Sequence, residues 1–232
     1  MATSSRMNQQ PATASDRVVL LHGIGHSRHN MYFTARALRR EGFTVTAISY
    51  PSLRHNIAAL AGFLEQRLGD LEIWKQPGRV HFVTHSMGGL LLRHYLDTRR
   101  DRIPAGRLGR VVMLGPPHGG SEFADFLRNF PPYKWIYGPA GQELTTAARA
   151  LDGTEPYYEL GIVAGTSGWP CVIANRLIPA PHDGRVAVAR TRLPGMKDHI
   201  TLPATHTLMA WQPAVHRQIV HFLQEGVFLR GR

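Results

Sequence analysis

The stretch VHFVTHSMGGL, residues 80–90, decides how the rest of the chain is interpreted. Its first five residues are mostly apolar or β-branched, which predicts a short buried strand. Apolar residues recur at helical spacing from Leu90 onward, and Gly88 with Gly89 supplies the small residues that a tight strand-to-helix turn needs. Ser86 is therefore expected on a sharp corner, where its hydroxyl projects from the sheet and faces the unpaired N–H groups of the next helix.

The corner departs from the usual Gly-x-Ser-x-Gly pattern at its first position, which Thr84 occupies. A threonine behind the corner demands more room than a glycine. The pattern favours a nucleophilic Ser86, and the alternative is an ordinary strand-turn-helix corner that carries a polar residue.

Composition places the chain among proteins with a single core. Its 232 residues suit one α/β sheet, and the formal net charge of +11 comes almost wholly from arginine. The arginines are spread along the chain, with Arg39-Arg40 and Arg99-Arg100 at predicted helix ends, where positive charge suits the helix dipole. The alternative is an anionic partner such as nucleic acid or phospholipid head groups. Because no nucleic-acid-binding motif accompanies the charge, we expect no nucleic-acid partner.

The cysteine content, the N-terminal residues and the lengths of the apolar runs indicate the cellular compartment of the protein. Cys171 is the only cysteine, so no intrachain disulfide is possible. Residues 1–16 are polar and predict a disordered tail without a secretory signal. No apolar run reaches transmembrane length, so we expect no stable membrane insertion and a cytoplasmic protein.

Strand and helix patterns alternate along the chain. Apolar strand patterns occur at 18–21, 43–49, 80–84, 110–114, 161–165 and 198–203, and helical patterns at 30–41, 56–68, 90–96 and 212–224. Such alternation predicts a single α/β domain with a mainly parallel, doubly wound sheet and helices on both faces. Gly23, Ser86 and Pro116 would then lie at the carboxyl edge of the strands, where such sheets bind ligands.

Residues 121–160 depart from this alternation. They combine several aromatic residues with Pro131, Pro132 and Pro139, and a helix is predicted from Gln142 to Leu151. Such a segment beside the edge could form the wall of an apolar pocket or a small lid. Its rings could equally fill core beneath a long loop, and the two interpretations carry equal weight.

A nucleophilic serine needs a base within hydrogen-bond reach and a third group that orients the base. The chain order serine, acid, histidine is met by Ser86, Asp183 and His206, each placed after a predicted strand. Asp152 and Asp198 compete with Asp183, but one precedes the strand at 161–165 and the other begins the last strand.

The chain offers other histidines as well. His22, His26 and His29 have a spacing that could suggest a metal, but no carboxylate or thiol cluster accompanies them. His85 is expected to pack beside the corner. The remaining candidates for the base lie within predicted elements: His199 in the last strand, and His216 and His221 on the last helix. His206, in contrast, follows the last strand in a loop.

Five ordered motifs together resemble the α/β-hydrolase superfamily, in particular small bacterial lipases and esterases and the inositol-deacylase-like hydrolases. They are Leu-His22-Gly-Ile-Gly, Thr-His-Ser86-Met-Gly-Gly, Leu-Gly-Pro-Pro-His118-Gly-Gly-Ser, His-Asp183-Gly-Arg-Val and Thr-His206-Thr, and the resemblance spans residues 17–225. It implies a hydrolase domain over residues 17–226. It further implies Ser86 as nucleophile, His206 as general base, Asp183 as its orienting acid, and the backbone N–H groups of Ile24 and Met87 as oxyanion hole.

The resemblance implies a serine hydrolase that cleaves carboxylic esters of short to medium acyl chain length through an acyl-enzyme. The expected partner is a small-molecule ester or lipid substrate, with no cofactor and no metal. Thioesterase, amidase or acyltransferase activity on the same three residues, or a non-catalytic binding module on a hydrolase scaffold, are the alternatives. The acyl chain length, the alcohol moiety and the oligomeric state are left open.

Overall fold

Strand β3 (Val80–His85) lies in the middle of the sheet, and all of its residues are buried. It pairs in parallel with β1 (Arg17–Leu21) on one side and with β4 (Leu108–Leu114) on the other. A strand covered on both faces and both edges needs an almost continuous run of apolar and β-branched residues. This requirement explains why the position of β3 can be recognised in the sequence.

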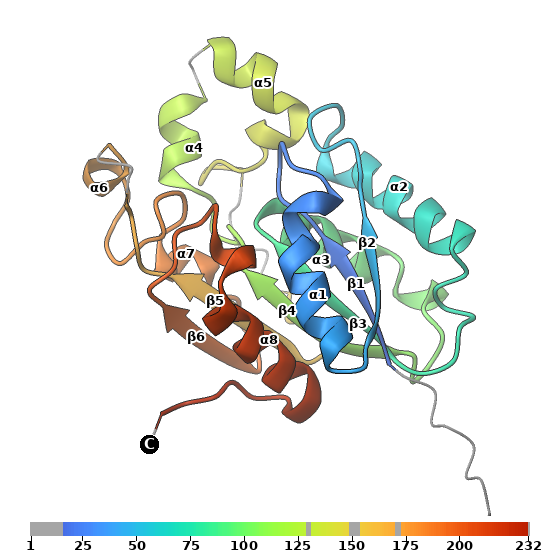
Figure 1. Ribbon diagram of the computed structural model, residues 1–232. Coiled ribbons are helices and arrows are strands. Elements are labelled where there is room, and N and C mark those ends of the chain that lie inside the picture. The colour runs from blue at the N-terminus through green and yellow to red at the C-terminus, as the bar shows by residue number, and fades with distance from the viewer. Residues whose placement is uncertain (1–15, 129–130, 149–153, 170–172, 232) are drawn as a thin grey trace, which may run out of the picture.

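The computed structural model describes residues 16–128, 131–148, 154–169 and 173–231. Its sheet has six strands in the order β2-β1-β3-β4-β5-β6, and every neighbouring pair is parallel. The remaining strands are β2 (Thr44–Ile48), β5 (Leu160–Gly165) and β6 (Asp198–Leu202). The predicted parallel α/β fold is therefore confirmed (Figure 1).

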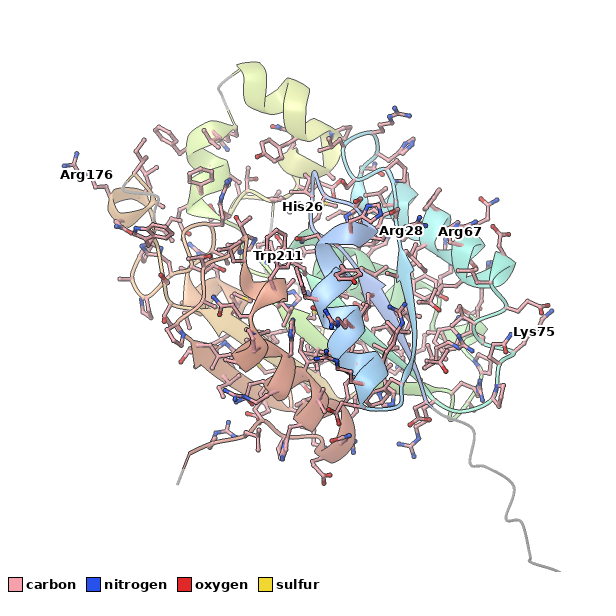
Figure 2. The ribbon with its side chains drawn as sticks, viewed as in Figure 1. His26, Arg28, Arg67, Lys75, Arg176 and Trp211 are labelled. Carbon is pink, nitrogen blue, oxygen red and sulfur yellow. The ribbon has the colours of Figure 1, made fainter. Side chains whose placement is uncertain are left out.

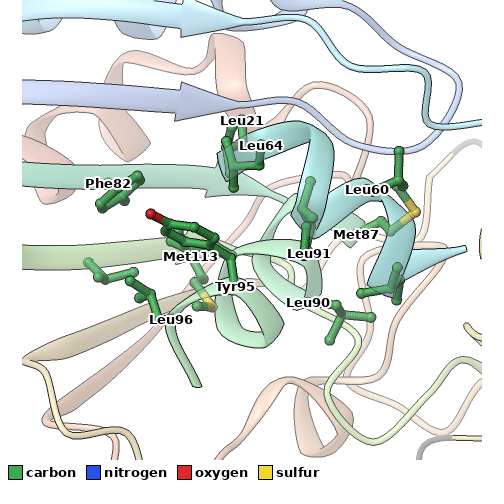
Figure 3. Close-up of a cluster of buried hydrophobic side chains, with 14 of the residues drawn as sticks. Leu21, Leu60, Leu64, Phe82, Met87, Leu90, Leu91, Tyr95, Leu96 and Met113 are labelled. Atoms are coloured by element: carbon green, nitrogen blue, oxygen red, sulfur yellow. The ribbon is translucent and has the colours of Figure 1, made fainter. Parts of the chain in front are cut away.

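Four longer helices cover the two faces of the sheet: α1 (Tyr32–Arg40), α2 (Ile57–Asp70), α3 (Met87–Thr98) and α8 (Pro213–Glu225). Helices α2 and α3 pack together on one face, in a core whose side chains Figure 3 shows around Phe82 and Met113. Helices α1 and α8 pack on the other face, where Leu38 and Phe222 are fully buried. Burial of these two apolar layers is the main favourable contribution to folding.

Local sequence signals define the ends of these helices. The Asn56 side chain accepts a hydrogen bond from the Ala59 N–H at 2.9 Å and caps α2. Pro213 begins α8, and Gly226 ends it in the left-handed conformation. Shorter elements connect the longer ones: 3₁₀ helices η1 (Arg28–Met31), η2 (Arg100–Arg102) and η3 (Met209–Trp211), and helices α6 (Ala174–Leu177) and α7 (Val188–Thr191).

Helices α4 (Glu122–Leu127) and α5 (Pro131–Gln142) stand beyond the carboxyl edge of the strands (Figure 1). A helix from Gln142 to Leu151 was predicted from the sequence instead, and this prediction is wrong over residues 143–148, which form turns. Within this turn segment, Leu144 is buried in the core. Asp125 accepts hydrogen bonds from the N–H and the hydroxyl of Thr146. These contacts hold a turn in place where the sequence predicted a helix.

The N-terminal tail predicted to be disordered falls largely outside the described residues, as does Cys171. Asp16 is described, and its carboxylate accepts hydrogen bonds from the Arg79 N–H at 2.8 Å and from the His81 ring at 3.2 Å. In the part of the chain that the structure describes, no helix is both long enough and apolar enough to cross a membrane.

Candidate active site

Ser86 has a backbone conformation that few residues other than glycine adopt. It lies between β3 and α3 with φ 54° and ψ −126°, outside the regions favoured by L-residues. Such a conformation costs about 1 to 3 kcal/mol and persists only where the surrounding structure enforces it. Here the Ser86 N–H donates to the Leu114 carbonyl at 2.8 Å, and the Ser86 carbonyl accepts from the Gly89 N–H at 2.9 Å. The corner predicted from the sequence therefore has the sharp, strained geometry of a nucleophile elbow.

Thr84, the departure from the usual elbow pattern, is fully buried behind this corner. The space for its side chain comes from Gly89, where a Cβ atom would lie 3.3 Å from the Thr84 hydroxyl oxygen and 3.0 Å from the Met113 sulfur. A threonine at the first position is thus accommodated because the elbow has a second glycine three residues after Ser86.

The structure brings together the three side chains that the chain order singled out. His206 Nε2 lies 2.9 Å from Ser86 Oγ, and His206 Nδ1 lies 2.7 Å from Asp183 Oδ2. Ser86 follows β3, Asp183 lies in the loop between α6 and α7, and His206 follows β6. All three are buried, Asp183 to 2 % exposure. A hydroxyl, an imidazole and a carboxylate in one hydrogen-bonded line can deprotonate the hydroxyl as it attacks a carbonyl carbon.

Asp183 is fixed by its own turn. Its Oδ1 accepts hydrogen bonds from the N–H groups of Arg185 at 3.0 Å and Val186 at 2.8 Å, which leaves Oδ2 for His206. The Asp183 carbonyl accepts from the His206 N–H at 2.9 Å. The acid and the base are therefore connected through main chain as well as side chains, which restricts the orientation of the imidazole.

His85 also contacts the main chain of His206, through a hydrogen bond to its carbonyl. Its Nε2 donates to the His206 carbonyl at 2.9 Å, and its Nδ1 accepts from the Asn30 amide at 3.3 Å. Burial lowers the pKa of His85 to about 3, so the ring is neutral and has one donor and one acceptor nitrogen. From the sequence, His85 was predicted only to pack beside the corner. No local signal could have revealed this contact, because His206 lies 121 residues further along the chain.

The loop after β1 lies against the elbow. A Cβ atom on Gly23 would sit 3.2 Å from the Ser86 Cβ, and Ile24 lines the cavity at Ser86. Within the described ranges, the N–H groups of Ile24 and Met87 donate to no protein acceptor. Both N–H groups are therefore available to a molecule bound beside Ser86.

The three histidines at positions 22, 26 and 29 have separate environments. His22 stacks on Tyr50 at 4.1 Å between ring centroids, and its Nε2 accepts from the Tyr50 N–H, while burial lowers its pKa to about 4. His26 lines the cavity at Ser86, whereas His29 lies 3.2 Å from the Ser27 hydroxyl (His26 is labelled in Figure 2). The described residues contain no group of three or more His, Cys, Asp or Glu side chains that could hold a metal.

A cavity of about 110 Å³ opens beside Ser86 and His206. Part of its wall comes from the segment at 121–160 that the sequence analysis singled out, through Phe123, Ala124, Tyr137 and Leu144. Ala124 and Leu144 also belong to the main hydrophobic core, and Tyr137 packs against it, so these residues do not separate the two interpretations of the segment. Phe130 and the side chains of Tyr133 and Trp135 lie outside the described residues.

Known proteins share this architecture. A family model described as the alpha/beta hydrolase family matches residues 18–226. The mature lipase BlEst2 of Bacillus licheniformis shares 21% identity over 94% of each chain, with a TM-score of 0.72. A metagenomic carboxyl esterase shares 19% identity, with a TM-score of 0.68 over 90% of this chain and 71% of its own. The RedJ thioesterase of Streptomyces coelicolor shares 15% identity, with a TM-score of 0.62 over 97% of this chain and 91% of its own.

Proposed function

The chain belongs to the alpha/beta hydrolase family, and we propose that it is a serine hydrolase that cleaves carboxylic esters of short to medium acyl chain length. The observation that carries the proposal is the hydrogen-bonded line from Ser86 through His206 to Asp183 at the strained corner. Strained backbone conformations of this kind cluster at active sites, so the conformation of Ser86 supports a reactive serine.

Hydrolysis proceeds through an acyl-enzyme in this proposal. Ser86 Oγ attacks the ester carbonyl while His206 Nε2 takes its proton, and His206 then gives that proton to the departing alcohol. Asp183 holds the Nδ1–H so that Nε2 faces the serine, without itself becoming protonated. Water repeats the attack on the acyl-enzyme with His206 again as base, which releases the acid and restores Ser86.

The negative charge on the substrate oxygen is stabilised by the N–H groups of Ile24 and Met87. Such donors act strongly because they are already oriented before the charge develops, and loss of one typically costs about 2.7 to 4 kcal/mol of barrier. The small cavity with its apolar wall favours a short to medium acyl chain over a bulky one.

Hydrolysis of a series of 4-nitrophenyl esters by the wild type and Ser86→Ala tests the proposal. We expect turnover to fall by roughly a thousandfold or more in Ser86→Ala, because the nucleophile is lost. Ser49→Ala is the matched control and should retain wild-type turnover, because it removes an exposed hydroxyl just after β2 whose hydrogen-bond partner is the Arg28 N–H at 3.0 Å. Equal activity of Ser86→Ala and the wild type would reject the assignment.

Thioester cleavage is the second candidate, since a thioesterase is among the solved structures of similar fold. The same attack and the same oxyanion hole serve a thioester, amide or acyl-transfer reaction. A matched oxygen ester and thioester with the same acyl group distinguish the two, through the ratio of their kcat/KM values. A non-catalytic binding module would leave Ser86 unreactive towards an organophosphonate.

A further inference from the structure

One permanent positive charge faces the cavity at Ser86. The lining residues within the described part of the chain include Arg185 but no aspartate or glutamate. The rest of the wall is largely apolar, with Phe123, Tyr137 and Leu144 among its residues. Arg185 is partly exposed at this wall, so its guanidinium is open to a molecule that enters the cavity.

Arg185 is held firmly at this position. Its N–H donates to Asp183 Oδ1 at 3.0 Å, and its carbonyl accepts from the Ser121 hydroxyl at 2.6 Å. Its guanidinium carbon lies 4.6 Å from the centroid of the Phe123 ring, a cation–π contact that directs the side chain along the cavity wall. Its backbone therefore belongs to the turn that fixes Asp183, while its side chain faces the substrate space.

The guanidinium makes no hydrogen bond or ion pair with any residue that the structure describes. Nearby Arg190, in contrast, pairs with Glu122 at 2.8 Å. A guanidinium has five N–H donors in a planar fork that matches a carboxylate or a phosphate. Arg185 thus presents unused donors within reach of a molecule bound at Ser86.

The charge of Arg185 also acts on His26, another cavity residue. Burial lowers the pKa of His26, and the charges of His206 and Arg185 lower it further, which favours the neutral ring at pH 7. At pH 7, Arg185 therefore supplies a positive charge to the cavity, whereas His26 does not. The net charge of +11 for the whole chain adds a long-range attraction for anions.

We propose that Arg185 is a specificity-determining residue that binds an anionic group of the substrate, so that the preferred ester carries a carboxylate or phosphate close to its scissile carbonyl. The inference rests on the proposed hydrolase function and names the substrate class of the same site. The anion can belong to the acyl group, as in a dicarboxylic monoester, or to the alcohol, as in an acyl glycerol phosphate.

Paired substrates distinguish these two sources. On the acyl side, 4-nitrophenyl butyrate is compared with mono-4-nitrophenyl glutarate, and on the alcohol side 1-butyrylglycerol is compared with 1-butyrylglycerol 3-phosphate. We expect the wild type to favour the anionic member of at least one pair in kcat/KM. Arg185→Gln should lower that anionic-to-neutral ratio by roughly tenfold to a hundredfold, the range for loss of a hydrogen bond to a charged group, and Arg185→Lys should lower it less.

Arg100→Gln is the matched control. Arg100 makes the other described cation–π contact, with its guanidinium carbon 4.2 Å from the Tyr157 ring centroid, away from the Ser86 cavity. This variant removes the same charge and the same kind of contact, and it should leave the substrate ratio at the wild-type value. The inference is overturned if Arg185→Gln leaves the ratio unchanged, or if the wild type prefers the neutral ester in both pairs.

Binding measured without turnover separates this inference from the proposed function. Calorimetry with monobutyl glutarate and with 1-butyrylglycerol 3-phosphate on Ser86→Ala, with and without Arg185→Gln, should show that at least one of the two ligands binds more weakly by roughly tenfold or more when Arg185 is lost. Binding that depends on Arg185 alongside turnover that does not depend on Ser86 would reject the hydrolase mechanism and retain the anion site. Turnover that depends on Ser86, alongside equal binding of each anionic ligand with and without Arg185→Gln, would reject the anion site alone.

Discussion

At the scale of single residues, the chain uses one histidine to hold another. His85 donates to the His206 carbonyl and accepts from Asn30, whose own carbonyl accepts from the Trp211 indole N–H at 2.9 Å. This series of hydrogen bonds connects η1 and η3 to the loop of the proposed base. Neither ring nitrogen of His85 forms a hydrogen bond with Ser86 Oγ. We therefore regard His85 as a positioning residue.

We predict that His85→Leu lowers kcat by roughly tenfold to a hundredfold with little change in KM, because the imidazole of His206 loses part of its support. His85→Gln should recover much of the loss, since its side-chain amide can again donate to the carbonyl. Steady-state kinetics of both variants, with circular dichroism as a control for folding, check this. Equal losses in the two variants would mean that packing volume, and not the hydrogen bond, supports the loop.

The room around Thr84 gives a second prediction at this scale. Gly89→Ala should destabilise the protein by about 1 to 3 kcal/mol, because the new methyl group meets the Met113 sulfur and the Thr84 hydroxyl in a filled core. Adding Thr84→Gly should restore part of the loss by opening that space. Urea unfolding of the single and double variants measures the coupling, and strictly additive effects would contradict the account.

At the scale of elements, the kink within α5 anchors the cavity wall. Gly138 has φ 58° and ψ −161°, and a Cβ atom there would lie 1.9 Å from the Leu53 carbonyl oxygen. We predict that Gly138→Ala displaces α5 and raises KM for esters, because Tyr137 leaves the cavity wall. Gly62→Ala, on α2 with open space around its added methyl group, is the control and should be neutral or slightly stabilising. An unchanged KM in Gly138→Ala would contradict the role of α5.

The same elements show what a sequence can predict. The strands were predictable because buried parallel strands require apolar and β-branched runs, and β3 and β5 are buried throughout. Helix α5 was not, because Pro139 and Gly138 interrupt its pattern and tertiary contacts hold its kink. Ser86, Asp183 and His206 could be selected from chain order, whereas the roles of His85 and Arg185 depend on residues distant in sequence.

At the scale of the whole molecule, buried histidines couple stability to pH. Burial lowers the pKa of His22 and His199 to about 4 and that of His85 to about 3. In the unfolded chain these rings take up protons below about pH 6.5. The unfolded state then binds more protons than the folded state, so the free energy of unfolding falls as the pH falls from about 6.5 towards 4.

We predict an uptake of about three protons on unfolding near pH 5.3 from these three histidines. His26, His81 and His216, whose pKa values burial also lowers, add to this uptake, and carboxylates add to it at lower pH. The slope of the unfolding free energy against pH, measured by urea titration, gives the total, which should be at least about three protons. His85→Gln should reduce it by about one proton. A free energy of unfolding that is constant between pH 7 and pH 5 would contradict the burial of neutral histidines.

The central claim is that Ser86 carries the acyl group during turnover. Rapid acid quench of the enzyme with a 4-nitrophenyl ester, followed by peptide mass spectrometry, tests it most directly. The account predicts the mass of one acyl group on the peptide that contains Ser86, and no adduct in Ser86→Ala. An acyl group on another residue, or continued turnover by Ser86→Ala with no adduct, would contradict it.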